Sequence, residues 1–200
     1  MNNHKLDFLR ELGNIGVGHA TTALSEMLNG KLFRLVVPDA RILPFEQAAN
    51  FIGGLDQVVA GIFMQISGDI SGHMAFILPE DSARLIVKML TEKANDDDNL
   101  FDELGRSALQ ELGNIMVTSY LNALAALADL VMTPSIPALA IDMAGAVWES
   151  VLAGALIDDE VTIIRTDFSA DGVAIDGHIV LLPDEEQFQK ITAALGLEEL

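Results

Sequence analysis

Residues 9–17 read Leu-Arg-Glu-Leu-Gly-Asn-Ile-Gly-Val, and residues 109–117 read Leu-Gln-Glu-Leu-Gly-Asn-Ile-Met-Val. The two stretches begin 100 residues apart. A second likeness follows them, because a Gly-His pair and an apolar run that ends in proline occupy both 72–79 and 177–183. Self-similarity at a fixed spacing indicates a duplicated structural unit. The chain of 200 residues is therefore predicted to contain a unit of about 100 residues twice.

Hydrophobic periodicity predicts the same order of elements in each unit: a helix, a short strand, a helix, two strands and a helix. We expect an α/β fold of the α+β type, with pseudo-two-fold symmetry and helices packed on a mainly antiparallel sheet. The helices are expected at 5–29, 44–52, 80–92, 100–130, 142–155 and 184–195, and the strands at 31–37 (ending at Pro38), 57–67, 72–78, 160–168 and 173–182.

The two repeats are expected to form a single domain over residues 1–200. They cover about 1–95 and 100–200, and an acidic linker at 95–99 joins them. The acidic run at 96–99 does not fit a calcium-binding loop, because Leu100 stands where the sharp-turn glycine belongs. We therefore interpret this segment as a solvated linker.

Composition and charge exclude several classes of function. The chain carries 30 acidic and 11 basic residues, a net charge of −19, which argues against nucleic acid or an anionic membrane as a partner. It has no cysteine, no apolar run long enough to span a membrane and no signal-like N-terminus, so we expect a cytoplasmic protein. Residues 101–200 contain 17 of the acids and only 3 bases. This excess serves solubility or faces a more basic protein partner.

A helical wheel at about 100° per residue places Asp7, Glu11 and Asn14 on the polar face of the first helix. Ser107, Glu111 and Asn114 take the equivalent places in the second helix. An exposed Glu–Asn pair on a helix is ordinarily part of a solvated surface. Shared ancestry of the two units is an alternative explanation for its presence in both. However, each pair encloses a glycine, Gly13 or Gly113, which weakens a helix. We therefore expect a flat surface of small residues that another molecule approaches closely.

A carboxylate beside a carboxamide lacks the parts of a self-sufficient hydrolase. The chain has no Ser-His-Asp order, no nucleophile-elbow motif and no phosphate-binding loop, and His19, His73 and His178 lack metal-ligand spacing. An amide can orient a water molecule, and a carboxylate can pair with a lysine of another protein. The predicted site is therefore incomplete without a partner.

At these residues the sequence resembles the CheC/CheX/FliY family of response-regulator phosphatases from chemotaxis. The family pattern is Asp or Ser, then Glu four residues later, Asn three residues after that, and Pro some two dozen residues further on. One copy consists of Asp7, Glu11, Asn14 and Pro38, and the other of Ser107, Glu111, Asn114 and Pro137. The Asn-to-Pro distances are 24 and 23 residues. Two copies in a chain of this length resemble the CheC-type members.

The resemblance implies hydrolysis of the aspartyl phosphate of a CheY-type receiver domain, which supplies the phosphoryl group, Mg²⁺ and a lysine. In this interpretation Glu11 and Glu111 pair with that lysine, and Asn14 and Asn114 position the attacking water. The chain itself binds no metal and is expected to be a monomer. A non-catalytic adaptor that binds a receiver domain or CheD is the alternative, and a phosphatase of another response-regulator pathway is a third.

The resemblance also implies a contact with CheD, the receptor deamidase that CheC-type proteins commonly bind. The segment 141–145, Ile-Asp-Met-Ala-Gly, resembles the region of that contact, and it makes Asp142 a candidate partner-binding residue. The start of a packed amphipathic helix is an equally good interpretation of the same segment.

Overall fold

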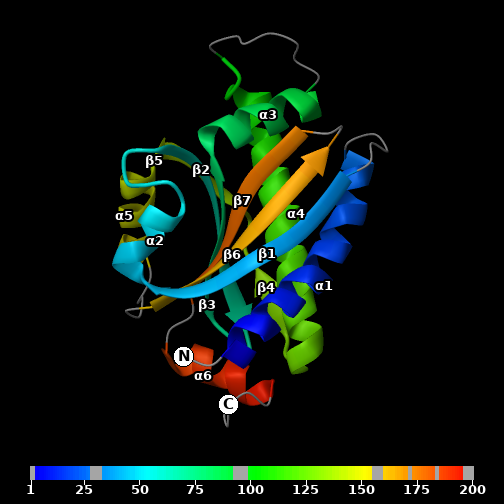
Figure 1. The fold of residues 1–200 in the computed structure, drawn as a ribbon, viewed down its shortest axis with the longest axis vertical. Coiled ribbons are helices and arrows are strands. Elements are labelled where there is room, and N and C mark those ends of the chain that lie inside the picture. Colours follow the sequence, from blue (N-terminus) through cyan, green and yellow to red (C-terminus); the bar gives the residue numbers. More distant parts are fainter. Residues whose placement is uncertain are drawn as a thin grey trace.

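The computed structural model describes residues 3–27, 33–91, 99–154, 160–170, 173–182 and 185–195. Most of the expected linker at 95–99, and residues 171–172 between the last two expected strands, lie outside the described residues. Figure 1 shows a twisted sheet with helices on both faces. The elements are α1 (Asn3–Met27), β1 (Phe33–Pro44), α2 (Phe45–Phe51), β2 (Val58–Gly68), β3 (Gly72–Pro79), α3 (Glu80–Thr91), α4 (Glu103–Ala128), β4 (Met132–Pro134), β5 (Ala138–Met143), α5 (Ala144–Gly154), β6 (Glu160–Ala170), β7 (Val173–Leu182) and α6 (Glu185–Ala194).

The seven strands form one sheet in which all the paired strands run antiparallel. Its order is β1-β6-β7-β3-β2-β4, and β5 also pairs with β2. Exchanging the two repeats swaps β2 with β6, β3 with β7, and β1 with the β4–β5 pair. The exchange returns the same order read backwards, which agrees with the predicted pseudo-two-fold symmetry.

The register of the central strands shows where the symmetry axis passes. His73 pairs with Leu182, and Ile77 pairs with His178. An exchange that maps the Gly-His pair of β3 onto that of β7 turns the first of these pairings into the second. The pairing of Ala75 with Val180 maps onto itself, so the axis passes through it.

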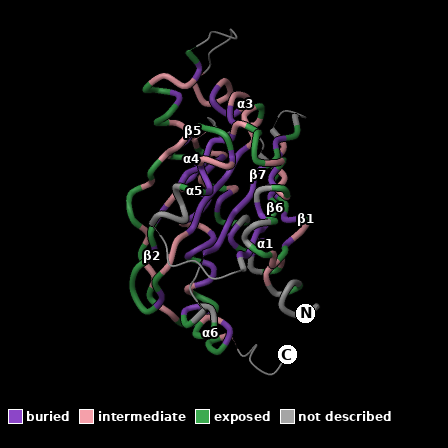
Figure 2. The backbone as a smooth tube through the Cα atoms, turned by 90° about the vertical axis from the view of Figure 1, so that its left-hand side faces the viewer, coloured by how far each residue is buried: buried purple, intermediate pink, exposed green. Residues whose placement is uncertain are grey.

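Each face of the sheet has its own hydrophobic core. α1, α3 and α4 supply buried residues such as Leu24, Ile86 and Met116 to the larger core, against which Ile191 of α6 also packs. Buried residues of α5, such as Trp148, and of the α2 region belong to the smaller core on the opposite face. Buried segments gather in the central strands, as Figure 2 shows. No helix in the described ranges combines the length and the apolar character that a membrane span requires.

α1 and α4, the long helices that open the two repeats, lie side by side and run in opposite directions (Figure 1). Their backbones approach closely at Gly16, where an added Cβ would come within 2.9 Å of the Cα of Tyr120. Tyr120 is fully buried, and this burial raises the pKa of its hydroxyl. The two repeats therefore present their first helices as one continuous layer over the sheet.

The prediction that a strand ends at Pro38 is wrong, because β1 continues to Pro44. The strand accommodates the proline by a shift of register: Val36 pairs with Asp167, whereas Asp39 pairs with Arg165. One extra residue of β1 is taken up there as a bulge, which is where a strand tolerates a residue without an N–H group.

The prediction of a helix from residue 142 is also wrong at its start. Asp142 and Met143 belong to β5, and α5 begins at Ala144. The predicted order includes a short strand in this part of the second repeat, but its residues were not assigned, because Pro134 and Pro137 interrupt the segment and make it look like a loop. The structure has two short strands there, β4 and β5. Pro134 pairs with Ile66, and Ala138 pairs with Phe63. The segment that joins β4 to β5 therefore contains one residue more than the stretch of β2 opposite it.

Candidate functional site

The two Glu–Asn pairs lie on the outer side of the α1–α4 layer. Glu11 and Asn14 are exposed on α1, and on α4 Glu111 is exposed and Asn114 is half-buried. Members of a pair are three residues apart, so their side chains are neighbours on the helix surface. Asp7 and Ser107 are also exposed, one turn before each glutamate. The expectation that these side chains face solvent is confirmed for all of them except Asn114, which is partly covered.

The glycines inside the two motifs do not form the exposed small-residue surface that the sequence suggested. Gly13 and Gly113 are both buried. A Cβ on Gly13 would lie 2.9 Å from a methyl group of Val37, and one on Gly113 would lie 2.5 Å from a methyl group of Ile62. That expectation is wrong, because the glycines let α1 lie close to β1 and α4 lie close to β2.

In the first repeat, Asn14 is joined to the bulge of β1. The backbone N–H of Val37 donates to the Oδ1 atom of Asn14 at 3.4 Å. This N–H group lies between Val36 and Asp39, where the register shifts. Pro38, which is exposed, follows directly. The contact gives the spacing between Asn14 and Pro38 a structural reason.

Charged residues tie α1 to β1 beside Glu11. Arg10 donates to Asp39 at 3.1 Å and to Asp7 at 3.5 Å, and Arg41 donates to Asp39 at 2.7 Å. Burial by itself would raise the pKa of Asp39, but the hydrogen bonds and charges of Arg41 and Arg10 outweigh it and lower that pKa. Asp39 therefore stays ionised and holds Arg10 beside the site.

In the second repeat, different contacts join α4 to the strand region. Gln110 donates its Nε2 to the carbonyl oxygen of Pro137 at 3.2 Å, and Arg106 donates to the carbonyl of Leu139 at 3.4 Å. The hydroxyl of Thr118 donates to the Oδ1 atom of Asn114 at 3.3 Å. Both sites thus contain an asparagine whose amide oxygen accepts a hydrogen bond from the protein.

The surface next to Asn14 is open to another molecule. A shallow hollow lies on α1, one turn beyond the asparagine, lined by Ile15, Gly18, His19 and neighbouring residues. Nothing lies within 4 Å of the position that a Cβ on Gly18 would take. This part of α1 is therefore not covered by other described residues of the chain.

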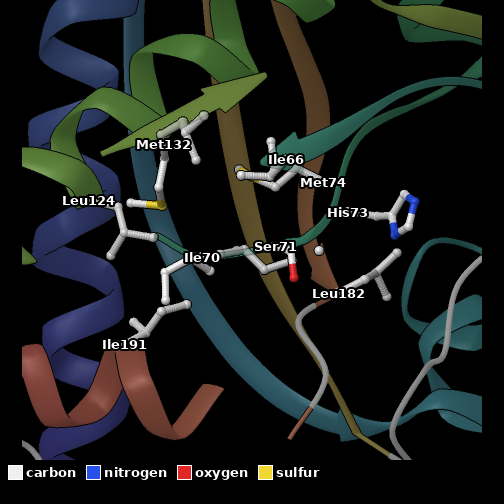
Figure 3. Close-up of a pocket in the computed structure, with 12 residues that line it drawn as sticks. Ile66, Ile70, Ser71, His73, Met74, Leu124, Met132, Leu182 and Ile191 are labelled. Carbon is white, nitrogen blue, oxygen red and sulfur yellow. The ribbon is translucent and has the colours of Figure 1, made fainter. Parts of the chain in front are cut away.

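The cavity in Figure 3 is a separate feature. It measures about 30 Å³ and is lined mainly by apolar side chains, among them Ile70, Leu124, Met132 and Ile191. It contains none of the Glu–Asn residues. It is therefore a small, partly open pocket that is separate from the Glu–Asn pairs.

The histidines have ordinary surroundings. His19 is exposed, and His178 is buried with its ring edge-on to Phe51 at a centroid distance of 5.8 Å. Burial, helped by the charge of Arg165, lowers the pKa of His178 to about 4, so it is neutral at physiological pH. Within the described ranges, no three His, Asp or Glu side chains come together as ligands of a metal ion would.

Asp142 lies on β5, the strand that pairs with β2. It is exposed, and its side chain accepts a hydrogen bond from the N–H of Met143 at 2.7 Å. Met143 and Leu55 are about half-exposed, at 50% and 56%, and the segments carrying them are joined by a hydrogen bond from Gly145 to Leu55. Asp142 therefore sits beside exposed apolar side chains.

Sequence reasoning missed the groups that hold the asparagines and their strands: the Val37 N–H, Gln110 and Thr118. The only sequence signal for them was the similar Asn-to-Pro distance in the two repeats. The residue type does not show whether a bulge has freed a backbone N–H group. A threonine inside a helix likewise does not indicate which group its hydroxyl bonds.

Two family profiles match the chain: "Chemotaxis phosphatase CheX" over residues 60–151 and "CheC-like family" over residues 5–40. The sequence is also similar to the "CheY-P phosphatase CheC" of Bacillus subtilis (strain 168). The two are 38% identical over 197 residues, which cover 96% of this chain and 94% of the relative.

Solved structures share the fold at lower identity. FliY from Thermotoga maritima is similar at a TM-score of 0.79, with 18% identity and 98% of each chain covered. The CheX-CheY-BeF3-Mg+2 complex from Borrelia burgdorferi contains a chain that is similar at a TM-score of 0.51, with 16% identity. That match covers 84% of this chain and 96% of the other.

Proposed function

The chain belongs to the CheC/CheX/FliY family, and we propose that it hydrolyses the aspartyl phosphate of a CheY-type response regulator in chemotaxis. The observation that carries this proposal is the exposed Glu–Asn pair, which occurs in both repeats on the outer side of the α1–α4 layer. The relative named as a CheY-P phosphatase matches the chain over nearly its whole length. The proposed substrate implies a site of action in the cytoplasm.

Glu11 and Glu111 are proposed to dock the receiver domain. Both carboxylates are exposed, and each lies one helical turn from its asparagine. A carboxylate on a rigid helix can pair with a lysine of the partner and so fix the partner's orientation. The role of these residues is therefore in binding and alignment.

Asn14 and Asn114 are proposed to position the attacking water. A primary amide offers an acceptor and two donors, so it can hold a water molecule and contact the phosphoryl group together. The water oxygen forms a bond to phosphorus while the bond to the aspartyl oxygen breaks, which yields inorganic phosphate and the free aspartate. Such catalysis depends on alignment rather than on a covalent intermediate with this chain.

Mg²⁺ is proposed to arrive with the receiver domain, where it stabilises the charge of the transferred group. One of the solved structures that share the fold is a complex of CheX and CheY whose name includes Mg. Pro38 and Pro137 are proposed to support the sites through the neighbouring strand segments.

The exposed surface around Asp142 is proposed as the contact for a CheD-type partner, bound by a monomer of this chain. Its support is an exposed carboxylate beside the half-exposed apolar side chains of Met143 and Leu55. Asp142→Ala should weaken binding of CheD, measured by calorimetry, and leave phosphatase activity intact. Equal affinity of the variant and the parent would remove Asp142 from the contact.

The phosphatase proposal is tested by the decay of a phosphorylated receiver domain in the presence of catalytic amounts of the chain. Asn14→Ala and Asn114→Ala should each remove part of the acceleration. In the double variant, the dephosphorylation rate that the chain adds should fall by on the order of a hundredfold. Asn50→Ala is the matched control, because Asn50 is exposed on α2, over the opposite face of the sheet.

Full activity of the double variant would refute the proposal. Complex formation by the parent with no change in phosphate lifetime would instead identify a non-catalytic adaptor.

A further inference from the structure

The two repeats hold their asparagines with different donors, and this difference points to an additional residue of the second site. The inference rests on the proposed phosphatase function and deepens it. We infer that Thr118 is a positioning residue, whose hydroxyl fixes the amide of Asn114 for catalysis.

In the first repeat, a backbone N–H group fixes the amide of the asparagine. The N–H of Val37 reaches Asn14 because the bulge of β1 displaces it from the regular ladder. The side chain of Val37 is only 7% exposed and packs over Gly13. The strand is therefore firmly seated against α1 at this point. Gly18, four residues beyond Asn14, has no side chain that could donate.

In the second repeat, the corresponding strand segment turns outward. Ile136, the residue before Pro137, is 89% exposed. Its neighbour Ser135 bonds to β2, since the Ser135 N–H donates to the carbonyl of Gln65 at 2.8 Å. The segment before the proline thus lies against β2 and solvent, and it does not pack on α4 as Val37 packs on α1.

Thr118 occupies the position in α4 that Gly18 occupies in α1, and its hydroxyl donates to the Oδ1 atom of Asn114 at 3.3 Å. The terminal torsion of an asparagine is broad, so an amide near the surface needs a fixed donor to choose one orientation. One donor to Oδ1 leaves the second lone pair and both N–H groups for the water and the phosphoryl group. The hydroxyl thus replaces the backbone donor of the first site.

The test uses the Asn14→Ala chain, in which only the second site can act. Rates of receiver dephosphorylation over a range of receiver concentrations give kcat and KM separately. Thr118→Val, which keeps the shape of the side chain, should lower kcat by roughly three- to tenfold, as expected for the loss of one neutral hydrogen bond, with KM within about twofold. Thr118→Ser keeps the hydroxyl and should restore kcat to within about twofold of the parent.

The matched control is Thr91→Val, which also removes a hydroxyl bonded to a group four residues earlier in a helix, the Val87 carbonyl at 2.7 Å. This control should match the parent in kcat. Melting temperatures of all variants separate loss of fold from loss of alignment.

An unchanged kcat in Thr118→Val, or an equal loss in Thr118→Ser, would overturn the assignment to the hydroxyl. An Asn14→Ala parent that is no faster than Asn14→Ala/Asn114→Ala would also overturn it, because the second site would then not be working. Full activity of that double variant would refute the phosphatase proposal itself, so the two failures are distinguishable.

Discussion

Gly16 and Gly18 are two positions apart on α1, yet their surroundings are opposite. Gly16 is buried where α1 crosses α4, and a Cβ there would lie 2.9 Å from the Cα of Tyr120. Gly18 faces open space. The first glycine is therefore required by packing between the helices, whereas the second makes no such contact and lowers the stability of the helix.

We predict opposite effects of the two substitutions on stability. Gly16→Ala should lower the free energy of unfolding by about 1–3 kcal/mol, because backbone of α4 must move to admit the methyl group. Gly18→Ala should raise it by up to about 1 kcal/mol, since alanine favours the helix. Urea unfolding of both variants beside the parent checks this. A stabilised Gly16→Ala chain would contradict the close approach of α1 and α4.

At the scale of elements, the long helices were the easiest to predict. The sequence placed the first two at 5–29 and 100–130, and the structure has them at Asn3–Met27 and Glu103–Ala128. Their apolar stripes repeat over several turns, so the period of the pattern is unambiguous. The polar face carrying Glu11 and Asn14 followed from the same pattern and is confirmed.

The strands that hold the sites were the hardest elements to predict. Proline is rare inside a strand, and no local feature of the sequence indicates that β1 passes through Pro38 by a bulge. The same difficulty concealed the position of the short strand expected in the second repeat, which the structure divides into β4 and β5 on the two sides of Pro137. Their partner, β2, is far away in sequence, and local patterns contain no information about such pairing.

Whether Gly13 and Gly113 face the sheet or the solvent could not be predicted either. Each motif places its glycine next to a polar residue, which suggested an exposed surface. Both glycines are in fact buried against strands, through contacts with Val37 and Ile62. Glycine has no side chain whose polarity would indicate a buried or an exposed position, so only the packed structure decides.

At the scale of the molecule, the strands of the two repeats alternate in one sheet, so strands of each repeat find partners in the other. β1 of the first repeat pairs with β6, and β4 and β5 of the second pair with β2. α1 and α4 also pack against each other. Separating the repeats would leave unpaired strand edges and one exposed apolar helix face on each side.

We predict that the fragments 1–95 and 96–200 do not fold as monomers when they are expressed alone. Co-expression should yield a one-to-one complex whose circular dichroism matches the intact chain, because the missing strand partners are then restored. Light scattering after size-exclusion chromatography measures the stoichiometry. A folded monomer of either fragment would show that the exchanged strands are dispensable.

The central claim is that two amides of this chain align water on a phosphoryl group carried by a partner. Its most direct test is the phosphate lifetime of a receiver domain that is saturated with the chain. At saturation, differences in affinity no longer affect the measured rate. Saturating parent protein should shorten that lifetime, and saturating Asn14→Ala/Asn114→Ala should leave the receiver's own decay rate, although the variant still binds. Decay as fast with the saturating double variant as with the parent would contradict the account.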